Sequence, residues 1–311
     1  MKTKAQLQAE IAQKRTAAVI INARSRHGER LYHQTLEGLA ARGLTVTASY
    51  PITHPSQMPQ AAKEALQSGT PLVILGGGDG TISSTMDYFA YQDVVVGILP
   101  LGTGNSFARG LGLPLEINAA IDVLANGKVV DVDLGKVGDN YYSNVVAIGF
   151  SADVAHNMPH NLKRVFGPLA YGIQALKYIL KSQKFRMTLT FDNQTYTTDS
   201  YQVLVANGSG FGLAPIIPGA HADERKLTVL ALKALNRWEL LDFWGRSLIG
   251  TPRQMKHVRD FTTQEITIQT TPPKTLDIDG EPGPQTPVTI SLAPEALKIM
   301  APQSFEEPWD D

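Results

Sequence analysis

The chain has 311 residues, a length that is enough for two domains. Of these residues 43% are apolar and 18% are charged, a composition that excludes an intrinsically disordered protein. The formal net charge of −1 argues against a general nucleic-acid-binding protein, so we expect no nucleic-acid partner. The absence of cysteine excludes disulfides and thiolate metal sites. No stretch approaches the roughly 18–20 apolar residues of a membrane span, and because residues 1–14 are polar we expect no signal peptide. We therefore expect a cytoplasmic protein.

The first part of the sequence alternates predicted strands with predicted helices. Alternation of this kind indicates a parallel sheet with helices on its faces. Ligands of such sheets bind beyond the carboxyl ends of the strands, and both glycine-rich turns of this sequence follow predicted strands. The strands are predicted over 17–22, 44–50, 72–75 and 94–99, and the helices over 29–42 and 57–67.

The first glycine-rich turn, residues 76–81, stands between a strand and a helix predicted over 82–91. It reads Gly-Gly-Gly-Asp-Gly-Thr. Glycines let the backbone turn tightly and bring its N–H groups close to an anion. A carboxylate at Asp79 is favourable among such donors when a cation or a phosphate-bound metal is also present. This turn predicts a site for a metal-bound nucleotide.

The second glycine-rich turn, residues 101–106, repeats the design after the strand over 94–99. It reads Leu-Gly-Thr-Gly-Asn-Ser, and a helix is predicted to start near Ser106. Arg109 follows Asn105 by one helical turn, where it either covers a phosphate or pairs internally. One such turn is weak evidence, whereas two at one edge of a sheet can face the same ligand. The sequence lacks the Gly-x-x-x-x-Gly-Lys-Ser/Thr pattern, which excludes a P-loop.

After residue 129 the pattern changes to closely spaced strands, which indicates an antiparallel sandwich or barrel. We assign residues 1–129 to a nucleotide-binding α/β domain and 130–300 to a β-sandwich substrate domain, with the extreme C-terminus, 301–311, returning to the first. An exposed sandwich edge would allow a homodimer. The strands are predicted over 130–137, 141–148, 185–191, 201–206, 227–231, 265–269 and 288–292, and helices over 168–181 and 238–250.

The two turns also resemble those of known kinases. Residues 77–81, Gly-Gly-Asp-Gly-Thr, resemble the nucleotide motif shared by diacylglycerol kinases, sphingosine kinases, NAD kinases and phosphofructokinases. Residues 99–109, Leu-Pro-Leu-Gly-Thr-Gly-Asn-Ser-Phe-Ala-Arg, are similar to the diacylglycerol kinase catalytic domain, particularly the bacterial soluble lipid kinases of the diacylglycerol/sphingosine kinase type. The likeness extends over nearly the whole chain, since it includes residues 22–28, 166–171, 206–208 and 279–282.

The resemblance implies both a fold and an activity. The fold is a phosphofructokinase/NAD-kinase-like N-terminal α/β domain with a parallel sheet, followed by a C-terminal antiparallel β-sandwich domain. The activity is an ATP- and Mg²⁺-dependent transfer of the γ-phosphoryl group to a hydroxyl of diacylglycerol or a related lipid. The acceptor lipid itself is not specified by the sequence.

The resemblance also implies which residues contact ATP and magnesium. Asp79 and Asp133 are implied to organise Mg²⁺ through water, and Asp79 also counts among the catalytic residues. The family has a third acid where this sequence has Ser106, which weakens the expected metal network. The residues implied to contact ATP are Asn22, Thr53, Gly77, Gly78, Asp79, Gly80, Thr81, Ile82, Ser83, Gly102, Thr103, Gly104 and Asn105.

The implied catalytic residue of the second domain lies in the Asp-Gly-Glu segment, residues 279–281. Glu281 corresponds to a general base that takes the proton of the substrate hydroxyl, and Asp279 is a second candidate for that base. From spacing alone, Gly280 and Pro282 equally indicate a turn that carries solvated acids.

A loop that matches a structural magnesium site of some bacterial relatives carries a less regular pattern here. Its ligand positions are occupied by His221, Glu224 and Lys226, with Asp223 as a substitute. Arg225 beside them opposes a divalent cation by its charge. A polar loop without metal is the alternative.

Residues 161–186 carry six lysines and arginines and no acid, with apolar residues at helical spacing. This pattern indicates a helix that packs its apolar stripe on the sandwich and presents a basic side to solvent. That basic side would attract anionic headgroups, so a peripheral contact with an anionic membrane surface stays open.

Two other functions stay open at this point. An NAD kinase-like small-molecule kinase shares the first nucleotide motif, although the second turn and the Asp-Gly-Glu segment speak against it. A non-catalytic nucleotide- or lipid-binding regulator is suggested by Ser106 and Arg225, because both depart from the pattern of the active family.

Overall fold

The computed structural model describes residues 1–24, 26–157, 179, 181–207, 210–211, 214–215, 225–233, 236, 238–248 and 256–307. They form two compact units. The first unit takes in residues 1–134 together with the chain from 293 onward, and the second takes in the described residues between 135 and 292. The chain passes from one unit to the other within two strands, β5 (Lys128–Val137) and β17 (Val288–Ala301).

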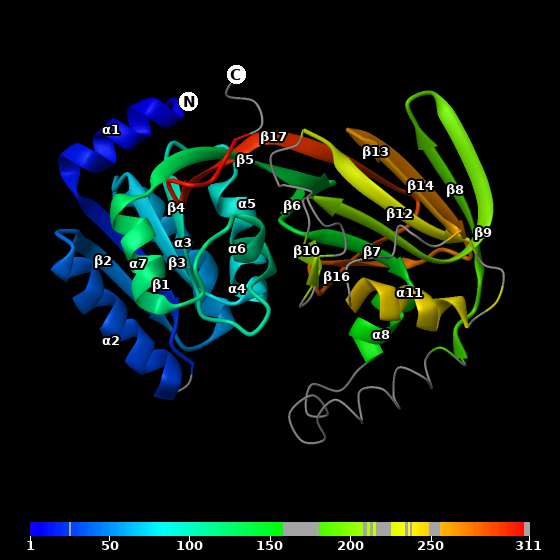
Figure 1. The fold of residues 1–311 in the computed structure, drawn as a ribbon, viewed down its shortest axis with the longest axis horizontal. Coiled ribbons are helices and arrows are strands. Elements are labelled where there is room, and N and C mark those ends of the chain that lie inside the picture. The colour runs from blue at the N-terminus through cyan, green and yellow to red at the C-terminus, as the bar shows by residue number, and fades with distance from the viewer. Residues whose placement is uncertain are drawn as a thin grey trace. The chain divides into compact units, whose positions relative to one another are not determined.

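The first unit contains a parallel sheet, as the sequence predicts (Figure 1). Its order is β17-β4-β3-β1-β2, and every pair in this series is parallel. The strands β3 and β4 are buried along their whole length, which explains why they appear in the sequence as unbroken apolar runs. The strands are β1 (Thr16–Asn22), β2 (Thr45–Ile52), β3 (Leu72–Gly77) and β4 (Val95–Pro100).

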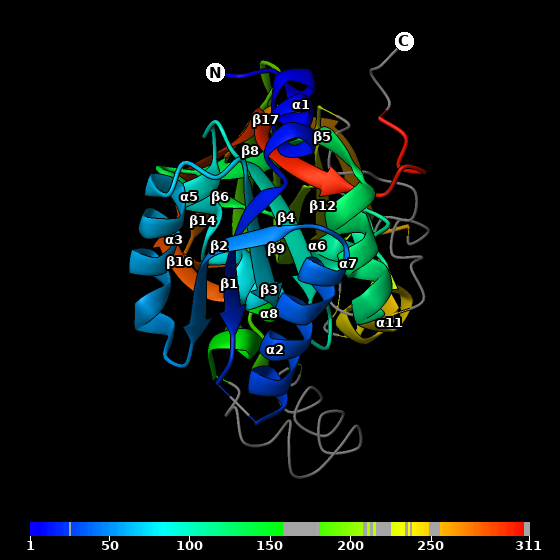
Figure 2. The same cartoon turned by 90° about the vertical axis from the view of Figure 1, so that its left-hand side faces the viewer.

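Helices cover both faces of this sheet (Figure 2). On one face Leu39 of α2 and Leu124 of α7 join Val19 and Ile74 of the strands in one buried cluster, to which Leu7 of α1 also belongs. On the other face lie α3 and α5 (Figure 2). The helices are α1 (Lys4–Lys14), α2 (Arg26–Ala41), α3 (Met58–Gln67), α4 (Asp79–Ser83), α5 (Met86–Phe89), α6 (Ser106–Gly110) and α7 (Ile117–Asn126), with a short 3₁₀ turn η1 (Pro55–Gln57).

The single helix predicted over 82–91 is wrong, because two short helices, α4 and α5, replace it. The Oγ of Ser84 donates to the backbone oxygen of Thr81 at 3.0 Å, and the Oγ1 of Thr85 donates to that of Ile82 at 2.7 Å. Hydroxyl groups that bond to nearby carbonyls in this way compete with the helical hydrogen-bond pattern. The hydroxyl residues Ser84 and Thr85, directly after α4, therefore end the helix.

The second unit is antiparallel and rich in strands, as predicted. Its main order is β16-β15-β7-β9-β8-β14-β17, while β12 pairs with both β9 and β13. The strands are β6 (Asn140–Tyr142), β7 (Val145–Gly149), β8 (Phe185–Phe191), β9 (Gln194–Asn207), β12 (Leu227–Lys233), β13 (Val258–Thr263), β14 (Glu265–Thr271), β15 (Thr275–Ile278) and β16 (Glu281–Gln285), with a separate pair β10 (Gly210–Phe211) and β11 (Ala214–Pro215).

The core of the second unit lies between strands whose side chains alternate inward and outward. In β8, for example, Phe185, Met187 and Leu189 are buried while the residues between them are not. The opposite face of part of this sheet packs against α8 (Phe150–Asn157) and α11 (Glu239–Leu248), through Phe150 and Phe243 among others. No helix in the described part of the chain is long and apolar enough to cross a membrane.

Three predictions for this unit need correction or stay outside the described residues. The strand predicted over 141–148 is interrupted at Ser143 and Asn144, which separate β6 from β7. The strands β13, β15 and β16 were not predicted. Of the helix predicted over 168–181, only residues 179 and 181 are described, and both are helical.

Candidate functional site

The first glycine-rich turn follows β3 and leads directly into α4. A Cβ atom at Gly77 would lie 2.5 Å from the Cβ of Thr81, so a larger residue would clash with the turn. The backbone N–H groups of Thr81 and Ile82 donate to the oxygen of Gly78 at 2.9 and 3.1 Å. This folds the chain back on itself at the carboxyl end of β3, where Gly80 is exposed.

The second glycine-rich turn lies directly against the first. A Cβ atom at Gly102 would lie 2.4 Å from the Cα of Gly78, so only two glycines permit this approach. The N–H of Leu101 donates to the oxygen of Gly77 at 2.9 Å. The expectation that both turns meet at one edge of the sheet is therefore confirmed.

A carboxylate joins the two turns. The Oδ1 of Asp79, in the first turn, accepts from the backbone N–H of Ser106 at 2.6 Å and from that of Phe107 at 3.4 Å. These residues open α6, so Asp79 caps a helix that follows the second turn. A Cβ atom at Gly104 would lie 2.6 Å from the Oδ2 of Asp79, which explains the glycine there.

Asn105 fixes the shape of the second turn. Its φ of +51° is left-handed, a conformation that asparagine tolerates better than most residues. Its Oδ1 accepts from the N–H of Gly102 and its Nδ2 donates to the oxygen of Gly102, both at 2.9 Å. The Nε of Arg109 donates to the oxygen of Gly104 at 2.9 Å, so Arg109 pairs internally. Thr103 at the tip is exposed.

Two further residues expected at the nucleotide lie at the ends of neighbouring strands. The Nδ2 of Asn22, at the end of β1, donates to the Oγ1 of Thr81 at 3.4 Å, which connects β1 to the first glycine-rich turn. Thr53 follows β2, and both its N–H and its hydroxyl bond to the side chain of Gln57, at 2.9 and 3.2 Å. The structure thus brings Asn22 to the turn, whereas the hydrogen bonds of Thr53 go elsewhere.

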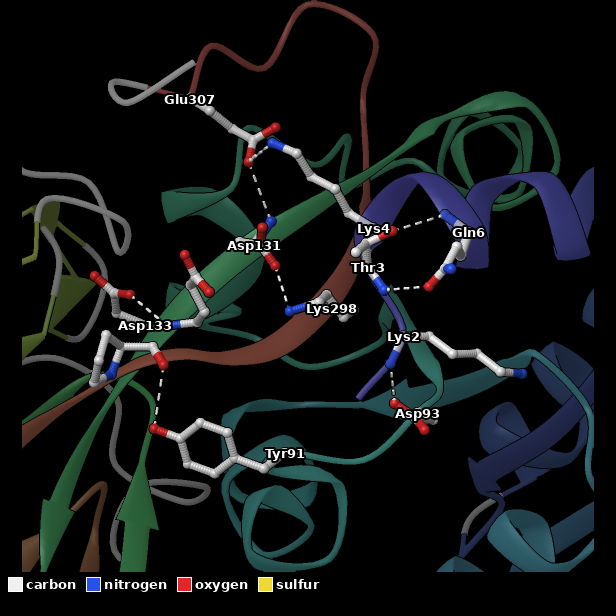
Figure 3. A network of polar contacts seen from close by, with 12 residues as sticks. Lys2, Thr3, Lys4, Gln6, Tyr91, Asp93, Asp131, Asp133, Lys298 and Glu307 are labelled. Atoms are coloured by element: carbon white, nitrogen blue, oxygen red, sulfur yellow. Dashed lines mark hydrogen bonds and ion pairs between the residues drawn. The ribbon is translucent and has the colours of Figure 1, made fainter. Parts of the chain in front are cut away.

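Asp133 lies on β5 and is 1% exposed. Its Oδ1 accepts from the backbone N–H of Glu295 at 2.8 Å (Figure 3). This bond ties β5 to the returning strand β17, so the carboxylate has a structural partner. Its expected role toward magnesium stays a prediction.

In the second unit, the Asp-Gly-Glu segment forms the hairpin between β15 and β16. Ile278 pairs with Glu281 across the hairpin, and the two residues of the loop, Asp279 and Gly280, have φ values of +51° and +96°. Asp-Gly is the residue pair that such a two-residue turn favours. Glu281 is the first residue of β16 and is exposed, and its carboxylate makes no hydrogen bond or ion pair within the described part of the chain.

The carboxylate of Asp279 is held by the start of β7. Its oxygens accept from the backbone N–H groups of Ser143, Asn144 and Val145 at 2.8, 3.0 and 2.8 Å, and from the Oγ of Ser143 at 2.9 Å. Sequence reasoning missed this cradle. Its signal was the Ser-Asn pair that interrupts a run of strand-forming residues.

The third expected site, the structural magnesium loop, is only partly described. Lys226 is exposed, while His221 and Glu224 lie outside the described residues. Elsewhere in the described chain, no three His, Cys, Asp or Glu side chains gather as metal ligands would.

Comparison with known proteins identifies both halves of the chain. Residues 16–137 match the diacylglycerol kinase catalytic domain, and residues 144–301 match the YegS C-terminal NAD kinase beta sandwich-like domain. The chain is 26% identical to a diacylglycerol kinase of Staphylococcus haemolyticus over 94% of its own length and 90% of that protein's. It is also 26% identical to one of Bacillus subtilis, over 85% of this chain and 89% of that protein.

The fold agrees with these matches. A crystal structure of a putative diacylglycerol kinase from Bacillus anthracis str. Sterne superposes with a TM-score of 0.78 at 25% identity, covering 94% of this chain and 97% of that one. The two family matches together span nearly the whole chain, and the fold is shared as well. The chain belongs to the diacylglycerol kinase catalytic-domain family, the bacterial soluble type of lipid kinase.

Proposed function

We propose that the chain transfers the γ-phosphoryl group of ATP to the hydroxyl of diacylglycerol or a related lipid, and that it requires Mg²⁺ for this reaction. The observation that carries the proposal is the contact of the two glycine-rich turns, which are joined through Asp79. Two turns in contact form one surface of backbone at the carboxyl edge of the sheet, where α/β proteins bind nucleotides.

The first turn offers backbone donors for the phosphates. The N–H groups of Gly78, Asp79 and Gly80 have no acceptor among the described residues. A Cβ atom at Gly80 would meet nothing within 4 Å, so a phosphate can approach the backbone there. Successive amides of this kind bind anions. We propose that they hold the triphosphate, with Thr103 of the second turn beside them.

The donor set fits Mg²⁺ bound largely through water and phosphate. This cation keeps several waters and is usually held by one or two carboxylates together with phosphate oxygens. The Oδ1 of Asp79 accepts backbone N–H groups, while its Oδ2 has no hydrogen bond within the described chain. We propose that this oxygen binds a water on the ion. Magnesium would supply positive charge against the charge that develops on the phosphates.

Glu281 is the proposed general base. Its exposed carboxylate accepts the proton of the lipid hydroxyl, the hydroxyl oxygen forms a bond to the γ-phosphorus, and the bond from that phosphorus to the bridging oxygen breaks to leave ADP. The products are the phosphorylated lipid, ADP and the proton. A carboxylate without a partner in the described chain can move toward the hydroxyl without first losing a hydrogen bond.

The test is a transfer assay with γ-labelled ATP, purified protein, Mg²⁺ and acceptors presented one at a time. Diacylglycerol, sphingosine and monoacylglycerol in mixed micelles form the lipid arm, and NAD forms the small-molecule arm. We expect label in a lipid and its loss when Mg²⁺ is chelated. Label in NADP would instead support the NAD kinase-like function, and ATP binding without turnover on any acceptor would support a non-catalytic regulator.

Two accessory properties are proposed with this function. Contact with an anionic membrane surface would make the rate higher on micelles that contain phosphatidylglycerol than on neutral ones at equal diacylglycerol content. A homodimer would appear in sedimentation equilibrium as twice the 33.7 kDa chain mass. Equal rates on both micelles, or a single-chain mass, would reject the respective property.

A further inference from the structure

We propose that Asp279 is a positioning residue, which holds the hairpin carrying Glu281 in place, and that it is not itself the base. This inference rests on the proposed role of Glu281. The sequence alone left both acids of the Asp-Gly-Glu segment open as the base, and the structure separates them by the contacts that each carboxylate makes.

Both oxygens of Asp279 are already engaged. The Oδ1 accepts from the N–H groups of Asn144 and Val145 at 3.0 and 2.8 Å. The Oδ2 accepts from the N–H and the Oγ of Ser143 at 2.8 and 2.9 Å. Three successive backbone amides therefore point at one carboxylate. A proton arriving at either oxygen would have to displace these donors, whereas Glu281 has no such donors within the described chain.

The cradle is itself fixed to the sheet. The N–H of Asn207, at the end of β9, donates to the oxygen of Asn144 at 2.8 Å, and its Nδ2 donates to that of Ser143 at 3.3 Å. The Nδ2 of Asn144 donates to the Oγ of Ser143 at 2.8 Å. All three side chains are buried. The amides that bind Asp279 thus belong to a rigid junction of β7 with β9.

The hairpin is bound to this junction through Asp279, and its tip is also held by a bond within the hairpin. The N–H of Asp279 donates to the oxygen of Val145 at 3.0 Å, so residue 279 is bound through both main chain and side chain. Within the hairpin, the N–H of Gly280 donates to the Oδ1 of Asp277, on β15, at 3.0 Å. Glu281 follows Gly280 directly, so its direction is set by how residues 279 and 280 are held.

The expected effect follows from the geometric demands of catalysis. Displacing a reacting group by about 1 Å costs on the order of 10²-fold in rate. Asp279→Asn keeps the size of the side chain but turns an NH₂ group toward backbone donors that need an acceptor. We expect kcat to fall about 10- to 100-fold, while KM for ATP stays within about twofold because the glycine-rich turns are unchanged.

Three measurements on the full-length chain separate positioning from base catalysis. The first is kcat as a function of pH for wild type, Asp279→Asn and Glu281→Gln. The second is hydrogen exchange at the amides of residues 143–149. The third is KM for ATP. Asp139→Asn, an exposed acid in the turn before β6, is the matched control and is expected to behave as wild type in all three.

We expect Asp279→Asn to keep the acid limb of the pH profile at its wild-type position while exchange at residues 143–145 becomes faster. Glu281→Gln is expected to lose the acid limb without faster exchange. Loss of the acid limb in Asp279→Asn would identify it as the base and overturn the inference. Wild-type kcat together with wild-type exchange would overturn it equally.

A second variant covers the case in which Asp279→Asn fails to fold. Ser143→Ala removes only the hydroxyl donor, and we expect kcat to fall about two- to fivefold with faster exchange at residues 143–145; no change in either would contradict the inference. If wild-type protein transfers no phosphoryl group, the proposed function has failed. The exchange measurement then still decides whether Asp279 holds the hairpin.

Discussion

The Oδ1 of Asp79 accepts a hydrogen bond from the backbone N–H of Ser106 at 2.6 Å. A carboxylate in the first glycine-rich turn thereby caps the helix that begins at the end of the second, and this one hydrogen bond joins residues that are 27 positions apart in sequence. This relationship gives Asp79 a structural role beside its proposed role toward Mg²⁺. The two roles can be separated by substitution.

Asp79→Ala removes both roles, whereas Asp79→Asn keeps an acceptor for the N–H of Ser106 and loses the charge. We expect Asp79→Ala to lower the free energy of unfolding by about 1–2 kcal/mol, and Asp79→Asn to cost less. Both should lose about 100-fold or more in kcat, since neither retains a carboxylate for the water-bound cation. Urea denaturation and a Mg²⁺ titration of the rate measure the two effects. Full activity of Asp79→Asn with an unchanged Mg²⁺ dependence would exclude the metal role.

The contact of the two turns predicts a contrast between two glycine substitutions. Gly102→Ala places a Cβ 2.4 Å from the Cα of Gly78, so we expect a loss of about 1–3 kcal/mol in the free energy of unfolding. Gly80→Ala meets nothing within 4 Å and should leave stability unchanged.

Calorimetric titration with ATP measures the effect of the second substitution, Gly80→Ala, on nucleotide binding. Gly80→Ala should bind ATP more weakly despite its unchanged fold, because its methyl group would occupy the space proposed for a phosphate. Wild-type stability in Gly102→Ala would contradict the close packing of the turns. Wild-type ATP affinity in Gly80→Ala would show that no phosphate approaches there.

The parallel sheet and the adjacency of its two turns could be predicted because buried strands appear as continuous apolar runs and glycines mark their ends. Other elements gave no such signal. The helix α1 contains only Leu7 and Ile11 as buried residues, too few for a visible apolar period. The strand β16 contains Pro282 and Pro284, and prolines in a sequence argue against a strand. The two prolines are tolerated because β16 lies at the edge of the described sheet.

Glu116 provides a prediction about pH. It is the N-cap of α7, and the backbone N–H of Asn118, followed by that of Ala119, lowers the pKa of its carboxyl below the usual value of 4.5. Because the pKa is lower in the folded state, the stabilisation is fully present above the unfolded pKa and is lost as pH falls through the folded one.

We therefore expect Glu116→Gln to lower the urea midpoint at pH 7, and the difference from wild type to shrink as pH falls below about 4.5. Glu37→Gln, an exposed acid on α2, serves as the control and should shift the midpoint at neither pH. A difference that grew toward acid pH would contradict the capping role.

Tyr142 gives a prediction for the second unit. Its side chain is fully buried, its hydroxyl has no hydrogen-bond partner within the described chain, and burial, followed by the charge of Asp279, raises the pKa of this hydroxyl well above its usual value. Burying a hydroxyl without a partner costs about 1–3 kcal/mol. Tyr142→Phe should therefore leave the free energy of unfolding unchanged or raise it. A loss of more than about 1 kcal/mol would reveal a hydrogen bond to this hydroxyl.

Gly135 packs directly against the ring of Tyr142 and leaves no room for a side chain. A Cβ there would lie 2.0 Å from the Cζ of Tyr142, so Gly135→Ala should strongly destabilise the unit, by about 1–3 kcal/mol or more. In a double-mutant cycle with Tyr142→Ala, the cost of Gly135→Ala should be smaller in the Tyr142→Ala background than in wild type, since the ring that clashes is gone. Equal stability of Gly135→Ala and wild type, by thermal denaturation, would contradict the packing.

The Asp-Gly-Glu segment, which is proposed to be catalytic, could be predicted from the sequence only in part. Its glycine and prolines predict a turn, and the turn is present with both loop residues at positive φ, although the two strands that it joins were not predicted. The cradle for Asp279 was not predictable, because it depends on three backbone amides that are more than 130 residues distant in sequence. Backbone donors carry no residue identity, so the Ser-Asn pair could mark an interruption of the strand but not the carboxylate that the amides bind.

The most direct test of the account is a single-turnover experiment on Glu281→Gln with labelled ATP, Mg²⁺ and a lipid acceptor that wild type uses. We predict that this variant binds ATP with wild-type affinity and transfers its γ-phosphoryl group about 10² to 10⁴ times more slowly, with no acid limb in its pH profile. Transfer at the wild-type rate would contradict the central claim that this carboxylate takes the proton of the acceptor hydroxyl.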